Sequence, residues 1–518
     1  MGLVLGVDIL GMSSKVFSGA IVGLEAKLVE VEVDVSHGLR SFNIVGLPDK
    51  AVEESKERIG AAIKNSKLLS TRQRTFRVLV NLAPADLKKE GTLYDLPIAI
   101  GFLIASKQTK FESKDKLFVG ELSLEGALRP VKGALSFALL AKREGIKEII
   151  LPKSNASEAA LVQDLNIIGV GSLKETIAYI EGKIQIAPHK LRNEDLFQNP
   201  EPQIDLAWIK GQEYAKRALE ITAAGGHNLF MFGPPGAGKT LLAKALPSIL
   251  PKLTLSESLE VTKIYSVAGL LPENNVLVNQ RPFRSPHHIA SEVALVGGGN
   301  PPKPGEITLA HRGVLFLDEF PEFHRDVLES LRQPLEEGRI TISRAKNIVT
   351  FPAQFMLVAA SNPCPCGHLN NPERNCTCTA SQVAMYRRKL SGPLMDRIDL
   401  FIEVPAVKYE KLSSEIPNGL GAKTREKIEK AREIQKQRFI RDKIWVNSEM
   451  IIPQIKKYCK YDSKSENLLR RFVDAGKLSA RGFHRVLKVA RTIADLAGST
   501  DIQYDHIAEA LMYRLKEG

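Results

Sequence analysis

Residues 233–240 form a glycine-rich segment with the sequence Gly233-Pro234-Pro235-Gly236-Ala237-Gly238-Lys239-Thr240. It follows the apolar run 229–232, which is typical of a buried parallel strand, and precedes a helical pattern over 241–246. Glycines let the backbone curl and aim its N–H groups at phosphate oxygens, and the N-terminus of the following helix faces the same phosphates. We expect Lys239 to reach the β- and γ-phosphates and the Thr240 hydroxyl to bind Mg²⁺. The stretch therefore predicts a site for a nucleoside triphosphate.

An acidic pair, Asp318-Glu319, ends a second apolar strand at 314–317. In enzymes with a phosphate loop, an aspartate at this place supports Mg²⁺, and the adjacent glutamate is well placed to activate water. Such a pair can also be ordinary surface charge at a strand end. With the phosphate loop upstream, we predict that Asp318 helps to hold Mg²⁺ and that Glu319 is catalytic, so that the nucleotide is hydrolysed.

The composition is that of a large folded protein. The chain has 518 residues, 44% of them hydrophobic and 25% charged, which is enough for about three domains with full cores. A net charge of +13 favours an anionic partner such as nucleic acid, although ribosome-associated and membrane-surface proteins share this property. No run of about 20 apolar residues predicts a transmembrane helix. The apolar segment 1–11 contains Asp8 and no positive residue, so we expect no signal peptide and a cytoplasmic location.

The patterning divides the chain into four parts. Residues 1–185 mix strand and helix patterns, including an alternating strand at 29–35, and residues 186–205 form a polar linker without periodicity. Residues 206–404 form the nucleotide-binding core, and residues 405–518 are charged and mostly helical by pattern. These patterns predict an α/β protein.

Several long segments resemble the ComM/YifB family of magnesium-chelatase-like AAA+ ATPases, and the resemblance extends over essentially the whole chain. The segments that carry it, besides the phosphate loop, are 42–49, 80–87, 284–288, 361–367, 391–400 and 490–496. The resemblance implies an N-terminal α+β domain like ribosomal S5 and Lon, an AAA+ core with a parallel sheet, and a C-terminal helical lid. It also implies a hexameric ring helicase or translocase that acts on single-stranded or branched DNA and promotes branch migration in recombination or natural transformation. No guanine-reading Asn-Lys-x-Asp motif is present, so we expect ATP with Mg²⁺ rather than GTP.

Three further residues resemble catalytic groups of AAA+ proteins. Asn362, after the apolar strand 355–360, resembles sensor 1, which helps to hold the attacking water, although an Asn-Pro pair also forms turns. Arg397 resembles the arginine finger that reaches the γ-phosphate of a neighbouring subunit. Arg481 resembles sensor 2 of the lid.

Both arginines have alternatives. Arg397 could instead form a structural ion pair with Asp396 or Asp399, and Arg485 and Arg491 are rivals of Arg481 for the sensor 2 role. A finger that acts on a neighbouring subunit implies a ring, and the resemblance makes a hexamer the expected form.

Four of the five cysteines gather in two Cys-x-Cys pairs, Cys364, Cys366, Cys376 and Cys378. In a chain without an export signal, such pairs indicate metal ligands rather than disulfides, and four thiolates suit tetrahedral Zn²⁺. His368 could replace one cysteine, and a reduced cluster that merely packs is the plain alternative. A complete set of four thiolates leaves no open position on the metal, so we expect a structural role.

Two segments of the core are candidates for DNA contact. Residues 338–352 read as a β-hairpin, and the family places such a hairpin just before sensor 1, where it projects into the ring pore. Arg344 and Lys346 near its tip could grip phosphates, or they could simply be solvated surface charges. A second insertion, 281–304, contains His287 and His288. Adjacent histidines in a strand would point to opposite faces, so we expect a packing or pore role rather than a metal site.

The N-terminal part is similar to the proteolytic domain of Lon over 120–133 and 145–152. Lon cleaves with a Ser–Lys dyad. The region of its serine corresponds here to 90–95, which contains no serine, and the lysine position falls at Leu135, with Lys132 nearby. Without a nucleophile and its base, no acyl-enzyme can form, so we expect this domain to serve assembly or DNA contact.

The leading expectation is therefore an ATP-driven DNA motor. The alternative is a chelatase-type motor whose ATP cycle remodels a protein partner, and an ATP-dependent protease is disfavoured because the dyad is missing. The positive charge and the basic hairpin favour DNA.

Overall fold

The computed structural model describes residues 12–71, 75–191, 204–271, 276–344, 347–369, 374–389, 392, 394–406, 420–442 and 444–514. They form two compact units. The first comprises the described residues before 199 together with the segment Ser258–Val278, and the second comprises the others. The expectations for residues 1–11, Lys346 and most of the linker 186–205 lie outside the described residues, and the domain boundaries read from the sequence stay predictions.

The first unit contains a seven-stranded mixed sheet in the order β3-β4-β2-β1-β5-β8-β9. Strand β2 pairs antiparallel with both β1 and β4, whereas the outer strands run parallel to their neighbours. The strands are β1 (Met12–Val22), β2 (Glu25–His37), β3 (Ser41–Val45), β4 (Phe76–Ala83), β5 (Lys116–Phe118), β8 (Glu148–Pro152) and β9 (Asn166–Val170), with a small hairpin of β6 (Glu121–Leu122) and β7 (Leu128–Arg129). The helices are α1 (Lys50–Asn65), α2 (Asp95–Ala105), α3 (Ala134–Arg143), α4 (Ala156–Ala159) and α5 (Leu173–Ile180).

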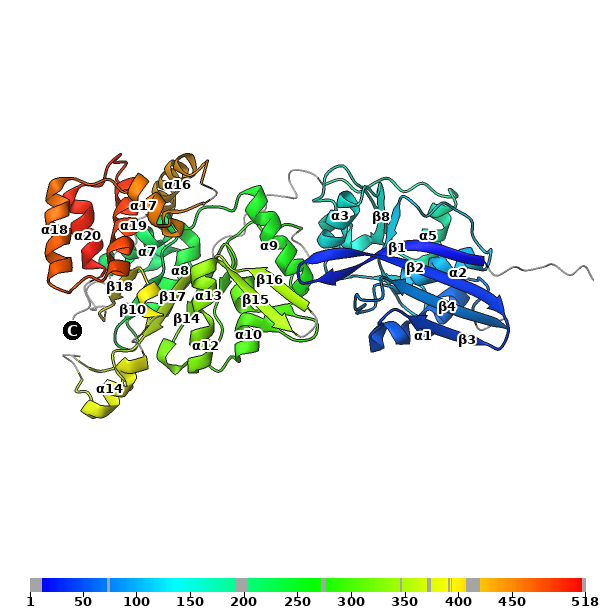
Figure 1. Cartoon of the computed structure of the whole chain (residues 1–518), viewed down its shortest axis with the longest axis horizontal. Helices are drawn as coiled ribbons and strands as arrows, with labels where there is room; N and C mark the ends of the chain where they lie inside the picture. The colour runs from blue at the N-terminus through cyan, green and yellow to red at the C-terminus, as the bar shows by residue number, and fades with distance from the viewer. Residues whose placement is uncertain are drawn as a thin grey trace, which may run out of the picture. The chain divides into compact units, whose positions relative to one another are not determined.

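Helices cover both faces of this sheet, because its strands alternate two sets of buried apolar side chains. In β8, Ile150 packs into the cluster under α1 and α2, whereas Ile149 and Leu151 pack into the cluster under α3 and α4. The strand predicted at 29–35 is confirmed as part of β2. These elements are blue to cyan in Figure 1.

Leu135, which the resemblance to Lon places at the lysine position, lies in the first turn of α3 and is buried in the cluster beneath that helix. Leu93, in the region 90–95 expected to match the serine, packs against the same cluster. Both side chains therefore contribute to core packing.

The second unit contains a five-stranded parallel sheet in the order β11-β14-β17-β10-β18. The strands are β10 (Leu229–Phe232), β11 (Phe283–Arg284), β14 (Val314–Leu317), β17 (Met356–Ser361) and β18 (Leu400–Glu403). A separate antiparallel hairpin is formed by β15 (Arg339–Arg344) and β16 (Asn347–Pro352), which confirms the hairpin predicted over 338–352. A short pair, β12 (Gly297–Gly298) and β13 (Lys303–Pro304), belongs to the insertion.

Helices on the sheet and helices of the C-terminal lid share one hydrophobic core. The core helices are α7 (Glu213–Gly225), α8 (Lys239–Ile249), α10 (Glu292–Val296), α11 (Glu306–Leu309), α12 (Arg325–Ser330), α13 (Arg332–Glu337) and α14 (Ala380–Lys389), and α9 (Leu255–Ala268) lies mostly in the segment that joins the first unit. The lid helices are α16 (Leu420–Arg438), α17 (Ile452–Tyr458), α18 (Ser463–Asp474), α19 (Ala480–Leu496) and α20 (Tyr504–Met512). Helix α7 packs against both α16 and α19, as Figure 1 shows in green, orange and red.

A buried carboxylate, Asp399, joins the sheet to the lid. It precedes β18, accepts a hydrogen bond from the Asn228 N–H at 3.0 Å, and forms an ion pair with Arg485 of α19. His227 lies 3.4 Å from Asp399 and is hydrogen-bonded to Thr492 of the same lid helix at 2.8 Å. Burial alone would raise the pKa of Asp399, but Arg485 and His227 lower it well below its ordinary value. The carboxylate therefore stays ionised and holds α19 against the amino-terminal edge of the sheet.

Within the described residues, no helix is long and apolar enough to cross a membrane.

The ion pair of Asp399 yields a stability prediction. Asp399→Asn should destabilise the second unit by about 3 kcal/mol, because it removes a buried carboxylate and leaves the partly exposed Arg485 without its charged partner. Because the folded-state pKa of Asp399 is lowered, this stabilisation is present at neutral pH and is lost on strong acidification. Both tryptophans, Trp208 and Trp445, belong to this unit, so urea unfolding followed by tryptophan fluorescence measures the change.

The matched control is Glu403→Gln, which removes an exposed carboxylate from β18, the strand that follows Asp399, and should shift the free energy of unfolding by no more than about 0.5 kcal/mol. Equal unfolding midpoints for the two variants would contradict the anchoring role of Asp399.

Candidate active site

The phosphate loop runs from the end of β10 to the start of α8. Gly238 precedes the helix with φ +87°, a left-handed conformation that disfavours residues with a side chain. The Lys239 ammonium donates to the carbonyls of Gly233 at 2.7 Å and Pro234 at 2.9 Å, and to Oδ1 of Asn362 at 3.1 Å. Burial lowers the pKa of Lys239. The loop, its lysine and the predicted sensor 1 residue are thus in contact.

The two predicted Mg²⁺ ligands are also in contact. The Thr240 hydroxyl donates to a carboxylate oxygen of Asp318 at 2.6 Å, although the two residues follow different strands. Hard oxygen ligands of this kind, completed by phosphate and water oxygens, suit Mg²⁺. The residues present therefore fit the ion that the sequence predicts.

Glu319, the predicted catalytic base, has an unusual backbone and a specific partner. Its φ of +49° is left-handed, which is rare for a residue with a long side chain. Its Oε2 lies 3.0 Å from Nδ1 of His288, and its side chain is 55% exposed. The expectation that the two adjacent histidines point to opposite faces of a strand is wrong. Both lie beyond the end of β11, and the rings of His287 and His288 are 4.2 Å apart.

Arg397 lies at the edge of the sheet opposite the phosphate loop. Leu229 and Leu400 are paired in the parallel register of β10 and β18, so the residues before them lie at the amino-terminal edge. There the Asn228 side chain donates to the Arg397 carbonyl at 3.1 Å. The phosphate loop begins at the other end of a strand that spans about 13 Å. The geometry therefore directs Arg397 away from the phosphates of its own chain.

The alternatives raised for Arg397 are not the contacts that form. Its guanidinium is largely buried and forms an ion pair with Glu336 rather than with Asp396 or Asp399. Sequence reasoning missed Glu336, because no motif indicates that α13 reaches this arginine.

Arg481 lies near Arg397. The two alternative candidates for sensor 2, Arg485 and Arg491, are each paired with an aspartate. The Arg481 side chain is 67% exposed, and its guanidinium lies 4.0 Å from the Asp396 carboxylate. Arg397 and Arg481 line one cavity of about 440 Å³. Arg485 is paired with Asp399, and Arg491 is buried against Asp495 at 3.1 Å. Arg481 is thus the exposed arginine among the three.

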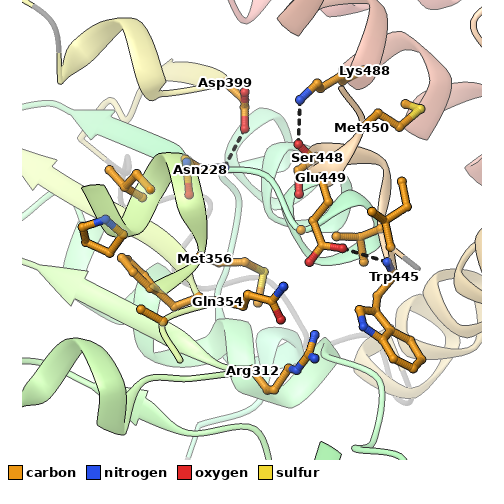
Figure 2. Close-up of a pocket in the computed structure, with 18 of the residues that line it drawn as sticks. Asn228, Arg312, Gln354, Met356, Asp399, Trp445, Ser448, Glu449, Met450 and Lys488 are labelled. Carbon is orange, nitrogen blue, oxygen red and sulfur yellow. Dashed lines mark hydrogen bonds between the residues drawn. The ribbon is translucent and has the colours of Figure 1, made fainter. Parts of the chain in front are cut away.

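A second cavity of about 450 Å³ lies between the amino-terminal edge of the sheet and the lid. Figure 2 shows Asn228 and Asp399 on the side of the sheet, and Ser448 and Lys488 on the side of the lid. Lys488 donates to the Ser448 carbonyl at 2.7 Å. Arg485 and Lys488 of the lid line both this cavity and the one that contains Arg397 and Arg481. The lid therefore contributes to both cavities at this edge of the sheet.

The four cysteines of the predicted metal site converge. The Sγ atoms of Cys364 and Cys366 are 3.4 Å apart, those of Cys366 and Cys376 are 3.5 Å apart, and those of Cys364 and Cys376 are 3.7 Å apart. Sγ of Cys378 lies within 4.8 Å of the others. These distances are too long for disulfides, and they approach the spacing of about 3.8 Å between thiolates around tetrahedral Zn²⁺. His368 is not part of this group.

The turn that carries Cys364 and Cys366 packs directly on the phosphate loop. Gly367 has φ +81°, and a methyl group placed on it would lie 2.5 Å from Cγ of Pro235. The Cys364-to-Gly367 turn and the phosphate loop therefore approach as closely as glycine allows. This contact was not predicted, since nothing in the sequence indicates that the two segments meet.

The predicted DNA-binding residues are only partly described. Arg344 ends β15, its side chain is not described, and Lys346 lies outside the described residues. The hairpin contacts the insertion, because Gly297 of β12 lies against the side chain of Ile342 in β15.

Three family models match the chain. "Magnesium chelatase, subunit ChlI" matches residues 205–412, "Subunit ChlI of Mg-chelatase" matches residues 31–155, and "Magnesium chelatase, subunit ChlI C-terminal" matches residues 420–514.

Full-length relatives are also found. The chain is 45% identical to the competence protein ComM of Haemophilus influenzae, with 96% of this chain and 97% of ComM covered. It is 43% identical to YifB of Escherichia coli, with 97% of each chain covered. A shorter match, 29% identical over 163 residues, is to the Lon protease of Amoebophilus asiaticus and covers 30% of this chain.

The contact between Gly367 and Pro235 yields a prediction on nucleotide binding. Gly367→Ala should raise the Kd for a fluorescent ATP analogue about tenfold, because overpacking costs about 1–3 kcal/mol and displaces the phosphate loop. The matched control is Gly476→Ala, which has a similar left-handed φ of +66° but no atom within 4 Å of the added methyl. The same Kd in both variants would show that the turn does not support the loop.

Proposed function

Because the chain belongs to the magnesium-chelatase-like AAA+ ATPases that include ComM and YifB, we propose that it is an ATP-dependent DNA motor. In this proposal identical copies form a hexameric ring in the cytoplasm. The ring acts as a helicase or translocase on single-stranded or branched DNA and promotes branch migration in recombination or natural transformation. The relation to the competence protein ComM over nearly the full length of both chains supports the link to DNA uptake.

The proposal of a ring is supported by the separation of the predicted catalytic groups between two edges of the sheet. Lys239, Asp318 and Asn362 all follow the carboxyl ends of parallel strands, whereas Arg397 and Arg481 lie near the amino-terminal edge. A single copy cannot bring both sets to one nucleotide. A second copy whose amino-terminal edge faces the phosphate loop would complete the site, with Arg397 exchanging Glu336 for the γ-phosphate of its neighbour.

Each residue then has a role in hydrolysis. The loop N–H groups and Lys239 bind the phosphates of ATP, and Thr240 and Asp318 hold Mg²⁺. Bound Mg²⁺ would neutralise charge that develops between the β- and γ-phosphates. Glu319 accepts a proton from the attacking water, and Asn362 orients that water. Arg397 and Arg481 stabilise the transition state from the neighbouring copy.

DNA contact is assigned to the β15–β16 hairpin. Arg344 and Lys346 near its turn would bind backbone phosphates, which gives affinity without sequence preference. The net charge of +13 supports an anionic partner.

A protein-remodelling motor is the second candidate. The descriptions of all three matching families refer to magnesium chelatase, and the motor subunits of such enzymes act on a protein. This candidate differs in one measurable respect, because DNA would not stimulate its ATPase.

We also propose that the four cysteines hold one structural Zn²⁺ per chain. The separations of their sulfur atoms support a closed tetrahedral site that braces the turn against the phosphate loop. All four positions on the metal are taken by thiolates, so the ion would have no direct part in hydrolysis.

The motor proposal predicts that DNA stimulates ATP hydrolysis. Purified protein should hydrolyse ATP several-fold faster with single-stranded DNA or a four-way junction than without DNA, and Lys239→Ala should abolish both rates. Robust hydrolysis that is indifferent to both DNAs would favour the protein-remodelling motor instead.

The hairpin proposal predicts a loss of that stimulation. Arg344→Ala combined with Lys346→Ala should reduce the stimulation of ATPase activity by DNA. The slope of the logarithm of the DNA-binding constant against the logarithm of the salt concentration should become shallower by about two, because two phosphate contacts are lost. The rate without DNA is the internal control. Unchanged stimulation and salt dependence would remove the hairpin from the mechanism.

The zinc proposal predicts one metal ion per chain. Elemental analysis of the purified protein should give about one zinc, and Cys376→Ser with Cys378→Ser should lose it. Removal by a chelator should weaken binding of an ATP analogue, whereas Cys459→Ser, which changes the buried lone cysteine, should retain the zinc. A zinc-free preparation that binds the analogue normally would contradict the proposal.

A further inference from the structure

We propose that the cavity of about 450 Å³ between the sheet and the lid is a second nucleotide site, which binds one nucleoside diphosphate and is separate from the phosphate loop. In this assignment, Arg432 and Lys488 bind the two phosphates. Glu449 accepts hydrogen bonds from the ribose hydroxyls, and the base stacks on Trp445. The inference goes beyond the proposed motor and does not depend on it, because it concerns ligand binding at the other edge of the sheet.

The first observation is a pair of cations in the wall of the cavity, Arg432 of α16 and Lys488 of α19. Arg432 donates to the Ala223 carbonyl at 2.7 and 3.2 Å, and Lys488 donates to the Ser448 carbonyl at 2.7 Å. Neither forms an ion pair with a carboxylate among the residues that the structure describes. Burial lowers the pKa of both side chains, because water is replaced by no full negative charge. A diphosphate would give each cation an anionic partner.

The second observation is the balance of the other charges that line the cavity. Four of the five lining carboxylates are already in ion pairs with arginines. These pairs are Asp399–Arg485, Glu257–Arg281, Glu336–Arg397 and Glu337–Arg339. The fifth carboxylate, Glu449, accepts the Trp445 N–H at 2.7 Å. Arg432 and Lys488 therefore outweigh Glu449, and the charge that the pairs leave in the cavity wall favours an anion.

The third observation is the order of the groups on the lid side. Glu449 lies between Lys488 and Trp445 in Figure 2, and its charge acts on both Arg432 and Lys488. A carboxylate in such a place is suited to ribose hydroxyls, and an aromatic ring beyond it is suited to a base. A cation, a carboxylate and an aromatic ring thus follow one another as phosphate, ribose and base do in a nucleotide.

The aromatic face is directed into the cavity. The Trp445 side chain is 41% exposed, and the Arg312 guanidinium lies 5.4 Å from the centre of its ring. Both residues line the cavity, so the face of the indole and the cation beside it meet the same space. From the sheet, Gln354 lines it as well, and its amide can both donate to and accept from the edge of a base.

The position and size of the cavity separate it from the phosphate loop. Asn228, which precedes β10, lines the cavity, whereas the phosphate loop follows β10. A volume of about 450 Å³ lies within the range of about 300–1,000 Å³ for small-molecule sites. A bound nucleotide would contact the sheet edge through Gln354 and the lid through Arg432 and Lys488. It would therefore add to the contacts that join the lid to the sheet.

The test uses Trp445 as its own reporter. Trp208→Phe leaves Trp445 as the single tryptophan of the full-length protein, and Lys239→Ala in the same chain disables the phosphate loop. We expect ADP and GDP to change the Trp445 fluorescence saturably, both with and without Lys239→Ala. Adenosine and inorganic pyrophosphate, the two halves of the ligand, should each bind more weakly by about tenfold or more, because each loses half of the contacts. Tighter binding of ADP would identify the hydrolysis product as the ligand, and tighter binding of GDP a nucleotide from another source.

Substitutions of Lys488 test the phosphate contact. Lys488→Gln should raise the Kd for the preferred nucleotide about tenfold, because it removes one charge-assisted hydrogen bond to phosphate. Lys488→Arg retains the charge and should restore the Kd to within about threefold of the parent value, which a merely structural role would not produce. The matched control is Lys430→Gln, which removes a largely exposed lysine from α16 and should leave the Kd unchanged.

An experiment on the unsubstituted protein covers the case in which Lys488→Gln does not fold. Photolysis with an azido derivative of ADP, followed by mass spectrometry, should label the segment around Trp445 as well as the phosphate loop. Labelling of the phosphate loop alone would overturn the inference. So would a Trp445 signal that disappears with Lys239→Ala, one that pyrophosphate reproduces at equal concentration, or an equal Kd in the parent and Lys488→Gln. None of these measurements uses DNA, so a failure of the DNA motor leaves them unaffected.

Discussion

The ion pair between Asp399 and Arg485 is the interaction on which the proposed active site depends most. Its carboxylate is buried at the amino-terminal edge of the parallel sheet and also accepts a hydrogen bond from the Asn228 N–H, whereas Arg485 is partly exposed. Removing one partner of such a pair lowers the free energy of unfolding by far more than a solvent-exposed ion pair adds to it. Because the pair fixes the lid helix α19 to the strand β18, it also fixes Arg481 beside Arg397. The edge that would act on a neighbouring copy in the proposed ring is therefore held together by the same contact that joins the lid to the sheet.

Parallel strands give the molecule two chemically different edges. The carboxyl ends bring together Lys239, Thr240, Asp318 and Asn362, although these residues come from three strands. Arg397 and Arg481 lie near the amino-terminal ends of the strands. In the proposed ring, each nucleotide would contact two copies, so hydrolysis in one copy would change its contact with the next.

Local patterns predicted the elements of the site well. The phosphate loop, its strand and the apolar strand before Asp318 lie where periodicity and glycine spacing indicated, because a buried parallel strand and a loop that curls around phosphate tolerate few other residue types. The convergence of four cysteines also followed from spacing and residue type. Sequence periodicity could not predict contacts between segments that are distant in the chain. Gly367 against Pro235, Glu336 with Arg397, and His288 with Glu319 depend on the tertiary arrangement. The histidine pair was misread because its strand ends earlier than the sequence suggests.

Rings that mix two inactive variants test whether a second copy completes the ATP site. Lys239→Ala and Arg397→Ala should each abolish ATPase activity alone. Co-expressed with different tags and purified through both, they should regain on the order of a quarter of the wild-type rate, because about one interface in four then joins an intact phosphate loop to an intact Arg397. Mixed rings that remain inactive would contradict a shared ATP site, because this result would mean that Arg397 acts in the site of its own chain.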